Sequence, residues 1–363
     1  MKRVKKLADR AGSDARKIPG TISGGRFIAE MLAGMPAYRC STTLALVVLA
    51  MLCVCGTSQG QQFPTKPIEI IAPFTPGSPL DVVARIVADI APKYMGQPVV
   101  VTNKPGAGGS LGAAELLNSK PDGYKLFVTT NFFFAMTTKS QKIPFDPANI
   151  VPLANMVQFV DGLCVRGDSP WKTFADLADY GKKNPGKIRW AHSGRGMVAH
   201  VAVLLVFRRA GVETIDIPYK GPPEKVTALL GGHIEASNMT YGTVVDHVRS
   251  GKIKFLFFFS DRRITRYPDL ANVPTIAEIG YSDLNQLTPF VGLYVHRDTP
   301  PQIRKTLTDA LKKTYDDPEF KKAVEKTGDE PRYGGPEFIA ESIKKGAEIG
   351  VPMLKELGLY VGK

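Results

Sequence analysis

The chain has few cysteines, and most of them lie at one end. Cys40, Cys53 and Cys55 fall within the first 60 residues, which leaves Cys164 alone in the remainder. One thiol can build neither a disulfide framework nor a cysteine metal site. The five histidines are scattered and lack the H-E-x-x-H spacing or any similar ligand pattern. The sequence therefore predicts no metal site.

Long apolar runs and clusters of basic residues are also missing after residue 60. A membrane-spanning helix needs roughly 20 apolar residues, so we expect a water-soluble body. Nucleic-acid binding calls for a run of basic residues or a basic stripe with interleaved aromatics, and neither is present. We therefore expect no nucleic acid among the partners.

Residues 1–60 have the order of a secretory signal, in which a basic segment precedes an apolar run and then small polar residues. The apolar run at 44–54 follows nine basic residues and is too short to cross a bilayer. We expect cleavage near residues 58–60, so that Gln61 begins the mature chain. Because the basic segment is long for a signal, Met31 and Met35 are alternative starts.

Two further properties of the first 60 residues bear on export. Lipid attachment at Cys53 or Cys55 is an alternative to simple cleavage, although a larger apolar residue precedes each cysteine where a small one is usual. Removing this segment lowers the net charge from +13 to +7. A moderately positive field favours anionic ligands, and it also serves solubility.

From residue 67 onward, short β-branched runs alternate with amphipathic stretches, which is typical of an α/β protein. The sequence predicts two doubly wound α/β domains with mostly parallel sheets, a hinge and an interdomain cleft. Domain I comprises residues 61–160 and 283–363, and domain II comprises residues 161–282. We expect strands at 68–72, 99–101, 126–128, 188–191, 216–219, 255–259 and 291–295, and helices at 80–94, 111–118, 174–183, 198–210, 224–230, 301–315 and 336–357. Such sheets bind ligands beyond the carboxyl ends of their strands, so the cleft is the expected site.

Two segments resemble sequence motifs of enzymes, but neither matches its motif completely. The glycine-rich turn at 104–112 follows a strand, yet counting G-x-G-x-x-G from Gly106 puts Leu111 at the third glycine. The nucleophile elbow G-x-S-x-G fails around Ser193, because Ala191 stands where the first glycine belongs. We therefore expect no cofactor and no enzyme activity.

Two strand-to-helix turns offer backbone N–H groups at the positive end of a helix dipole, which suits a carboxylate. In the turn at 75–81, Ser78 could donate to an anion, whereas Asp81 either begins the helix as a capping residue or contacts the ligand. In the turn at 193–197, Arg195 either adds a fork of donors or points to solvent.

The chain resembles the receptors of tripartite tricarboxylate transporters, the TctC-like or Bug-type periplasmic binding proteins, from about residue 64 to its C-terminus. The resemblance is carried by the order and spacing of short pieces. They are Pro67-Ile68, Pro73-Phe74-Thr75-Pro76-Gly77 with Asp81 and Ala84-Arg85, Gly96-Gln97-Pro98-Val99-Val100-Val101 with Asn103, Pro105-Gly106-Ala107-Gly108-Gly109, Pro121-Asp122-Gly123-Tyr124, Asn184-Pro185-Gly186-Lys187, Pro218-Tyr219-Lys220-Gly221, and Val273-Pro274-Thr275 with Glu278 and Gly280.

This resemblance implies a periplasmic receptor that closes on a small organic carboxylate and passes it to a membrane permease of a large and a small subunit. The ligand carboxylate would be held largely by backbone groups and waters from the two facing loops, and a monomer suits a receptor that must release its cargo. The candidate ligand-binding residues are Thr75, Gly77, Ser78, Asp81, Thr130, Asn131, Phe132, Ser193, Gly194, Arg195, Gly196 and Tyr219.

The two loops depart from the family pattern, so the ligand is not assumed to be citrate. Gly77-Ser78-Pro79 replaces the usual consecutive glycines, and Arg195 replaces a small or apolar residue. We hypothesise that Arg195 pairs with a second acidic group of the ligand and that Phe132 forms an aromatic wall. The alternative is an exported sensor for an aromatic acid, nicotinate or an amino acid that feeds a signalling system. For an amino-acid or nicotinate-like ligand, Asp81 would recognise a positive group.

Overall fold

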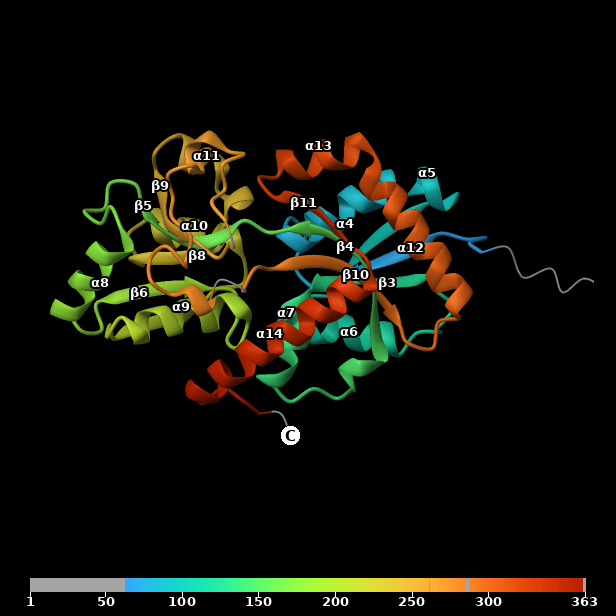
Figure 1. The fold of residues 1–363 in the computed structure, drawn as a ribbon, viewed down its shortest axis with the longest axis horizontal. Coiled ribbons are helices and arrows are strands. Elements are labelled where there is room, and N and C mark those ends of the chain that lie inside the picture. Colours follow the sequence, from blue (N-terminus) through green and yellow to red (C-terminus); the bar gives the residue numbers. More distant parts are fainter. Residues whose placement is uncertain (1–62, 261, 285–286, 362–363) are drawn as a thin grey trace, which may run out of the picture. The chain divides into compact units, whose positions relative to one another are not determined.

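The computed structural model describes residues 63–260, 262–284 and 287–361, and the expected signal segment lies outside them. The described residues form two lobes, each built around one sheet with helices on both faces (Figure 1). Lobe I contains six strands in the order β11-β4-β10-β3-β1-β2, and lobe II contains five in the order β7-β6-β8-β5-β9. The predicted class, two α/β units that face each other, is confirmed.

The strands and helices follow one another along the chain with short connections. The strands of lobe I are β1 (Ile68–Ala72), β2 (Val99–Asn103), β3 (Lys125–Thr130), β4 (Ile150–Gln158), β10 (Phe290–His296) and β11 (Glu330–Gly334), and those of lobe II are β5 (Asp161–Arg166), β6 (Ile188–His192), β7 (Thr214–Pro218), β8 (Ala236–Thr240) and β9 (Ile253–Phe258). The helices are α4 (Pro79–Ile90), α5 (Pro92–Met95), α6 (Ser110–Leu117), α7 (Asn131–Ala135), α8 (Phe174–Lys183), α9 (Val198–Arg209), α10 (Pro222–Leu230), α11 (Val245–Arg249), α12 (Pro301–Asp316), α13 (Pro318–Lys326) and α14 (Pro336–Glu356).

Strand pairing is mixed, where we expected mostly parallel sheets. β1 pairs in parallel with β2 and β3, and β6 pairs in parallel with β7 and β8. β10 is antiparallel to β3 and β4, and β5 is antiparallel to β8 and β9. The parallel pairs follow helical crossovers within a lobe, whereas β5 and β10 come directly from the other lobe, where no crossover helix sets their direction.

The chain passes between the lobes twice, after β4 and after β9, and the two crossings are joined by a hydrogen bond. The N–H of Phe159 donates to the carbonyl oxygen of Pro289 at 3.0 Å. A third link is α14, which begins against β4 and α7 in lobe I and ends against lobe II (Figure 1). Met353 and Leu354 near its end are buried in the apolar core of lobe II, and Arg208 of α9 donates to the carbonyl oxygen of Glu356 at 2.9 Å.

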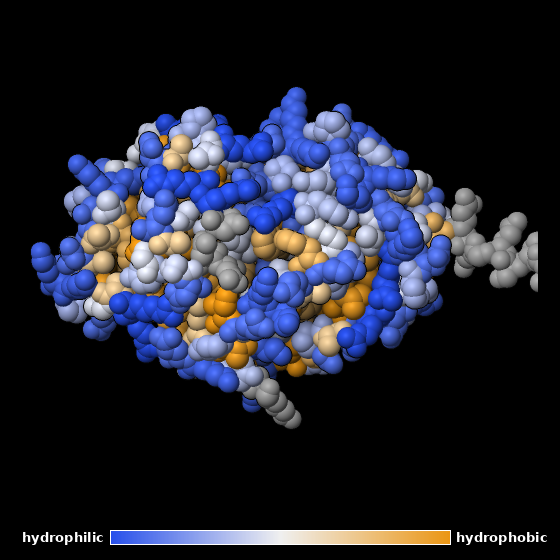
Figure 2. Space-filling model, viewed as in Figure 1, coloured by the Kyte–Doolittle hydropathy of each residue, from blue (hydrophilic) through white to orange (hydrophobic). Residues whose placement is uncertain are grey.

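Alternate residues of each central strand enter the cores on the two faces of the sheet. In β1, Ile68 and Ile70 pack against α4 and α12, whereas Ile71 packs with α6 and α7 on the opposite face. This two-fold alternation is what a strand buried on both faces requires. In the described ranges, no helix combines the length and apolar character needed to span a bilayer. The face of the molecule in Figure 2 is mostly hydrophilic, with separate hydrophobic patches.

Candidate functional site

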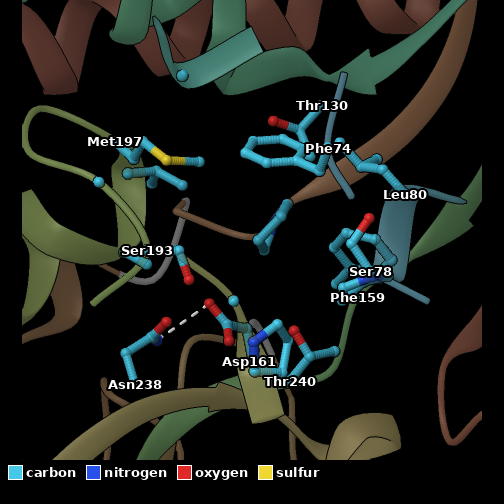
Figure 3. Close-up of a pocket in the computed structure, with 18 of the residues that line it drawn as sticks. Phe74, Ser78, Leu80, Thr130, Phe159, Asp161, Ser193, Met197, Asn238 and Thr240 are labelled. Atoms are coloured by element: carbon cyan, nitrogen blue, oxygen red, sulfur yellow. Dashed lines mark hydrogen bonds between the residues drawn. The ribbon is translucent and has the colours of Figure 1, made fainter. Parts of the chain in front are cut away.

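A cavity of about 140 Å³ lies between the two lobes. It is bounded by the carboxyl end of β3, the turns after β1 and β6, the end of β8 and the start of β5. Thr130, Ser78 and Phe74 approach it from lobe I, and Ser193 and Thr240 approach it from lobe II (Figure 3). The cavity thus occupies the position expected for a ligand in facing α/β sheets.

Much of the wall is apolar. The apolar lining comes from aromatic, aliphatic, thioether and proline side chains of both lobes: Phe74, Leu80, Phe133, Phe159, Met197, Val198, Pro222 and Pro289. In Figure 3, Met197 faces Phe74 and Leu80 across the open space. Such a wall excludes water and strengthens the few polar contacts that a small ligand makes.

Three helices begin at this cavity. The residues before α4, α9 and α10 are Ser78, Met197 and Gly221, and all three line it. Each helix N-terminus carries a partial positive charge. Unsatisfied N–H groups are fewest at α10, because its first two residues, Pro222 and Pro223, have none. The convergence of the three N-termini from two lobes creates a region that favours an anion.

The first of these turns is organised by Asp81, which is 1% exposed. Its carboxylate accepts hydrogen bonds from the Gly77 N–H at 2.8 Å, from Arg85 at 2.9 and 3.0 Å and from Asn103 at 2.8 Å. Burial acts to raise the pKa of Asp81, but these hydrogen bonds outweigh it and the pKa is lowered. Asp81 does not line the cavity, so its contacts are those of a residue that shapes the loop.

The second turn is held by two buried histidines. His192 ends β6, and His200 lies in the first turn of α9. The N–H groups of Gly194 and Gly196 donate to Nδ1 of His192 at 3.0 Å and to Nδ1 of His200 at 3.2 Å. The Nε2 atoms of the two rings face the Asp216 carboxylate at 3.1 and 3.4 Å. Each ring therefore fits a neutral tautomer with its proton on Nε2, accepting from a glycine and donating to Asp216.

The same contacts argue against a metal ion at this cluster, although its ligand atoms lie within 4.8 Å of one another. A metal on Nε2 would move the ring proton to Nδ1, where it needs an acceptor. Gly194 and Gly196 instead present N–H donors at those positions. Burial lowers the pKa of both histidines, that of His200 to about 4, which also favours the neutral rings.

A buried polar cluster lines the lobe II side of the cavity. Asn238 of β8 donates through Nδ2 to the Asp161 carboxylate at 3.1 Å, drawn as a dashed line in Figure 3. Lys225 of α10 donates through Nζ to the backbone carbonyl of Asn238 at 2.7 Å. Burial raises the pKa of Asp161 and lowers that of Lys225, and the attraction between the two charges opposes both shifts.

Four of the twelve candidate residues line the cavity: Ser78, Thr130, Ser193 and Gly194. The other eight, which do not line it, are Thr75, Gly77, Asp81, Asn131, Phe132, Arg195, Gly196 and Tyr219. Arg195 has a largely exposed side chain, 3.2 Å from the Asp216 carboxylate, and is thus paired within the protein. The amide oxygen of Asn131 accepts from the N–H of Phe290 at 3.1 Å.

The aromatic wall comes from Phe133, where we had hypothesised Phe132. Phe132 is 1% exposed and packs in an apolar core with Met136 and α14. Both residues belong to the helical turn α7, in which successive side chains point about 100° apart. Phe133 therefore faces the cavity, whereas Phe132 points into the core.

Sequence reasoning missed the polar cluster and part of the apolar wall. Asp161, Asn238, Phe159 and Thr240 lie on or beside β4, β5 and β8, which we had not predicted. Lys225 was inside a predicted helix, but one lysine in a helix carries no signal of burial.

This architecture, with two α/β lobes and helix N-termini around a small cavity between them, is that of a solute-binding receptor. Residues 83–359 match the family model described as the tripartite tricarboxylate transporter family receptor, and the chain belongs to this family. A Cupriavidus necator relative, described as the UPF0065 protein in gbd 5'region, is 34% identical over 326 residues, covering 88% of this chain and 96% of that protein.

Two solved structures show the same fold. The periplasmic binding protein BugD is 28% identical, with a TM-score of 0.73, over 82% of this chain and 99% of that one. MatC from Rhodopseudomonas palustris with bound malate is 26% identical, with a TM-score of 0.69, over 79% of this chain and 100% of that one.

Proposed function

We propose that this protein is an exported receptor that captures a small organic carboxylate between its lobes and delivers it to the membrane subunits of a tripartite transporter. The observation that carries the proposal is the convergence of α4, α9 and α10, whose N-termini line one cavity from two lobes. Fixed helix dipoles stabilise a carboxylate through backbone groups.

Two further observations support this function. The chain belongs to a receptor family named for its transporter, and MatC, a relative in fold, was solved with malate. We further propose that the protein acts in the periplasm as a monomer, released there by cleavage near residues 58–60, and that it binds its ligand without chemical turnover. The Asp81 carboxylate is hydrogen-bonded by Gly77, Arg85 and Asn103, which argues against the amino-acid alternative that depended on it.

The test is a thermal-shift screen of the purified protein against mono-, di- and tricarboxylates, aromatic acids and amino acids. A ligand that binds the folded state raises the melting temperature by mass action, by about 2.7 kcal/mol of stability at a ligand concentration of 100 Kd. We expect a shift with one class of small carboxylate, and small-angle scattering should then show a more closed molecule. A shift with nucleotides and none with any carboxylate would overturn the proposal.

A further inference from the structure

A buried lysine faces the cavity with most of its donors unused. Lys225 is 4% exposed and lines the cavity from the first turn of α10. An ammonium group has three N–H donors, but within the described part of the chain its one hydrogen bond goes to the carbonyl of Asn238. A buried charge with unused donors is costly, and a ligand that accepts from it recovers that cost.

A buried carboxylate belongs to the same corner of the cavity. Asp161 is 7% exposed, starts β5 and lies opposite Thr240 of β8 in the sheet. It accepts from Asn238, the residue whose carbonyl receives the lysine. Lys225 and Asp161 interact through their charges, and no hydrogen bond joins them in the described part of the chain. A donor and an acceptor of opposite charge thus both line the cavity and both bond to Asn238.

Lys225 and Asp161 together discriminate between the chemical groups that a ligand could place beside them. A second carboxylate would accept from Lys225 but would be repelled by Asp161. An ammonium group would attract Asp161 but would be repelled by Lys225. A methylene group would add no hydrogen bond to either charge. A hydroxyl group accepts from the ammonium and donates to the carboxylate, so it satisfies both.

We infer that Lys225 and Asp161 recognise a hydroxyl group on the ligand, so that the substrate class is the short hydroxycarboxylates. This inference rests on the proposed function, in which the helix N-termini receive the ligand carboxylate. The cavity volume of about 140 Å³ favours a ligand that is small overall. A cavity of roughly 150 Å³ holds a benzene-sized molecule, which corresponds to an acid of about four carbon atoms with its oxygens.

Calorimetric titration with matched four-carbon acids tests this inference. The ligands are butyrate, 2-, 3- and 4-hydroxybutyrate with both enantiomers where they exist, 3-aminobutyrate and succinate. We expect one hydroxybutyrate to bind at least about tenfold more tightly than butyrate, the ratio that corresponds to one net hydrogen bond to a charged group. The amino acid and the dicarboxylate should bind more weakly than that hydroxy acid.

Variants then assign the preference to the pair. Lys225→Met and Asp161→Asn should bring the hydroxybutyrate-to-butyrate affinity ratio close to one, while butyrate affinity changes by only a few-fold. The double variant, with Lys225→Met and Asp161→Asn, leaves neither charge buried without its partner. If a single variant does not fold, the affinity ratio can still be measured on this double variant. Lys187→Met removes an exposed lysine of the same lobe and should leave the ratio unchanged.

Three outcomes would overturn the inference. Equal affinities for butyrate and all hydroxybutyrates would do so and leave the carboxylate receptor intact. Tighter binding of succinate than of any hydroxybutyrate would mean that Lys225 takes a second carboxylate. Binding of none of these or any other carboxylate would remove the proposed function together with the inference.

Discussion

The pH dependence of stability should reveal the buried, neutral state of His200. Burial and the neighbouring His192 lower the pKa of His200 to about 4. The attraction of the Asp216 carboxylate raises this pKa, but it offsets only part of the decrease. In the unfolded chain a histidine has a pKa near 6.5. The unfolded state therefore binds the proton more tightly, and the folded state loses stability as the pH falls from 6.5 towards 4.

The expected magnitude follows from the width of this interval. Each pH unit within it costs about 1.4 kcal/mol, so His200 should cost the folded state about 2 kcal/mol at pH 5. Buried acids act in the opposite direction, because burial raises the pKa of Asp329 to about 7 and raises that of Asp161. Their contributions must be cancelled by comparing the wild type with a variant that lacks only the histidine.

The suitable variant is His200→Asn, whose amide oxygen can still accept from the Gly196 N–H near the position of Nδ1. Urea unfolding should be followed by tryptophan fluorescence, since the two tryptophans, Trp171 and Trp190, both lie in lobe II. The ring of Trp190 stacks on that of His200, with 5.8 Å between the ring centroids. The variant should be less stable than the wild type at pH 7.5, and this deficit should shrink by about 2 kcal/mol at pH 5.

His233→Asn, which removes an exposed histidine of lobe II, serves as the matched control. A deficit of the His200 variant that is equal at both pH values would refute the reasoning. It would show that folding does not change the proton affinity of this ring.

Three further predictions concern single residues. Gly196→Ala should lower the stability of the fold and weaken ligand binding measured by calorimetry. The reason is that φ of Gly196 is +74° and a Cβ there would lie 2.1 Å from Oγ of Ser140 in the other lobe. The control Gly211→Ala, where φ is +70° and no atom lies within 4 Å, should cost only about 1 kcal/mol of stability. Asp81→Asn should cost about 2 kcal/mol in thermal unfolding, since the turn loses its charged acceptor; an unchanged melting temperature would contradict this. Burial raises the pKa of the Cys164 thiol to about 12, so mass spectrometry should find no alkylation at pH 8 until the protein is unfolded.

The helices that sequence reasoning located best have both a helical periodicity of apolar residues and capping residues that mark where the helix begins. The helix predicted at 174–183 is α8 with the same bounds, and Thr173 and Asp176 form a capping box at its start. The predicted helix at 80–94 instead breaks after Ile90, because Pro92 starts the separate turn α5. Local signals of this kind are readable from the chain without knowledge of its tertiary contacts.

The strands that were missed carry no such signal. β8 reads Ala-Ser-Asn-Met-Thr, and four of its five residues are nevertheless buried, because it is a central strand with α9 and α10 packed against it. Its Asn238 bonds to Asp161 across 77 positions of sequence. The site is therefore split: the loops at Ser78 and Ser193 follow from strand-to-helix patterns, whereas the buried polar cluster depends on pairings that only the folded chain creates.

The path of α14 bears on attempts to exchange specificity between relatives. A graft that takes the segment between the two crossings from another receptor would transfer the strands and helices of lobe II. It would leave behind Met353 and Leu354, which complete the apolar core of that lobe from the far end of the chain. The lobes are thus not independent modules, and a chimera should fold well only if the last turns of α14 are inherited from the donor of lobe II.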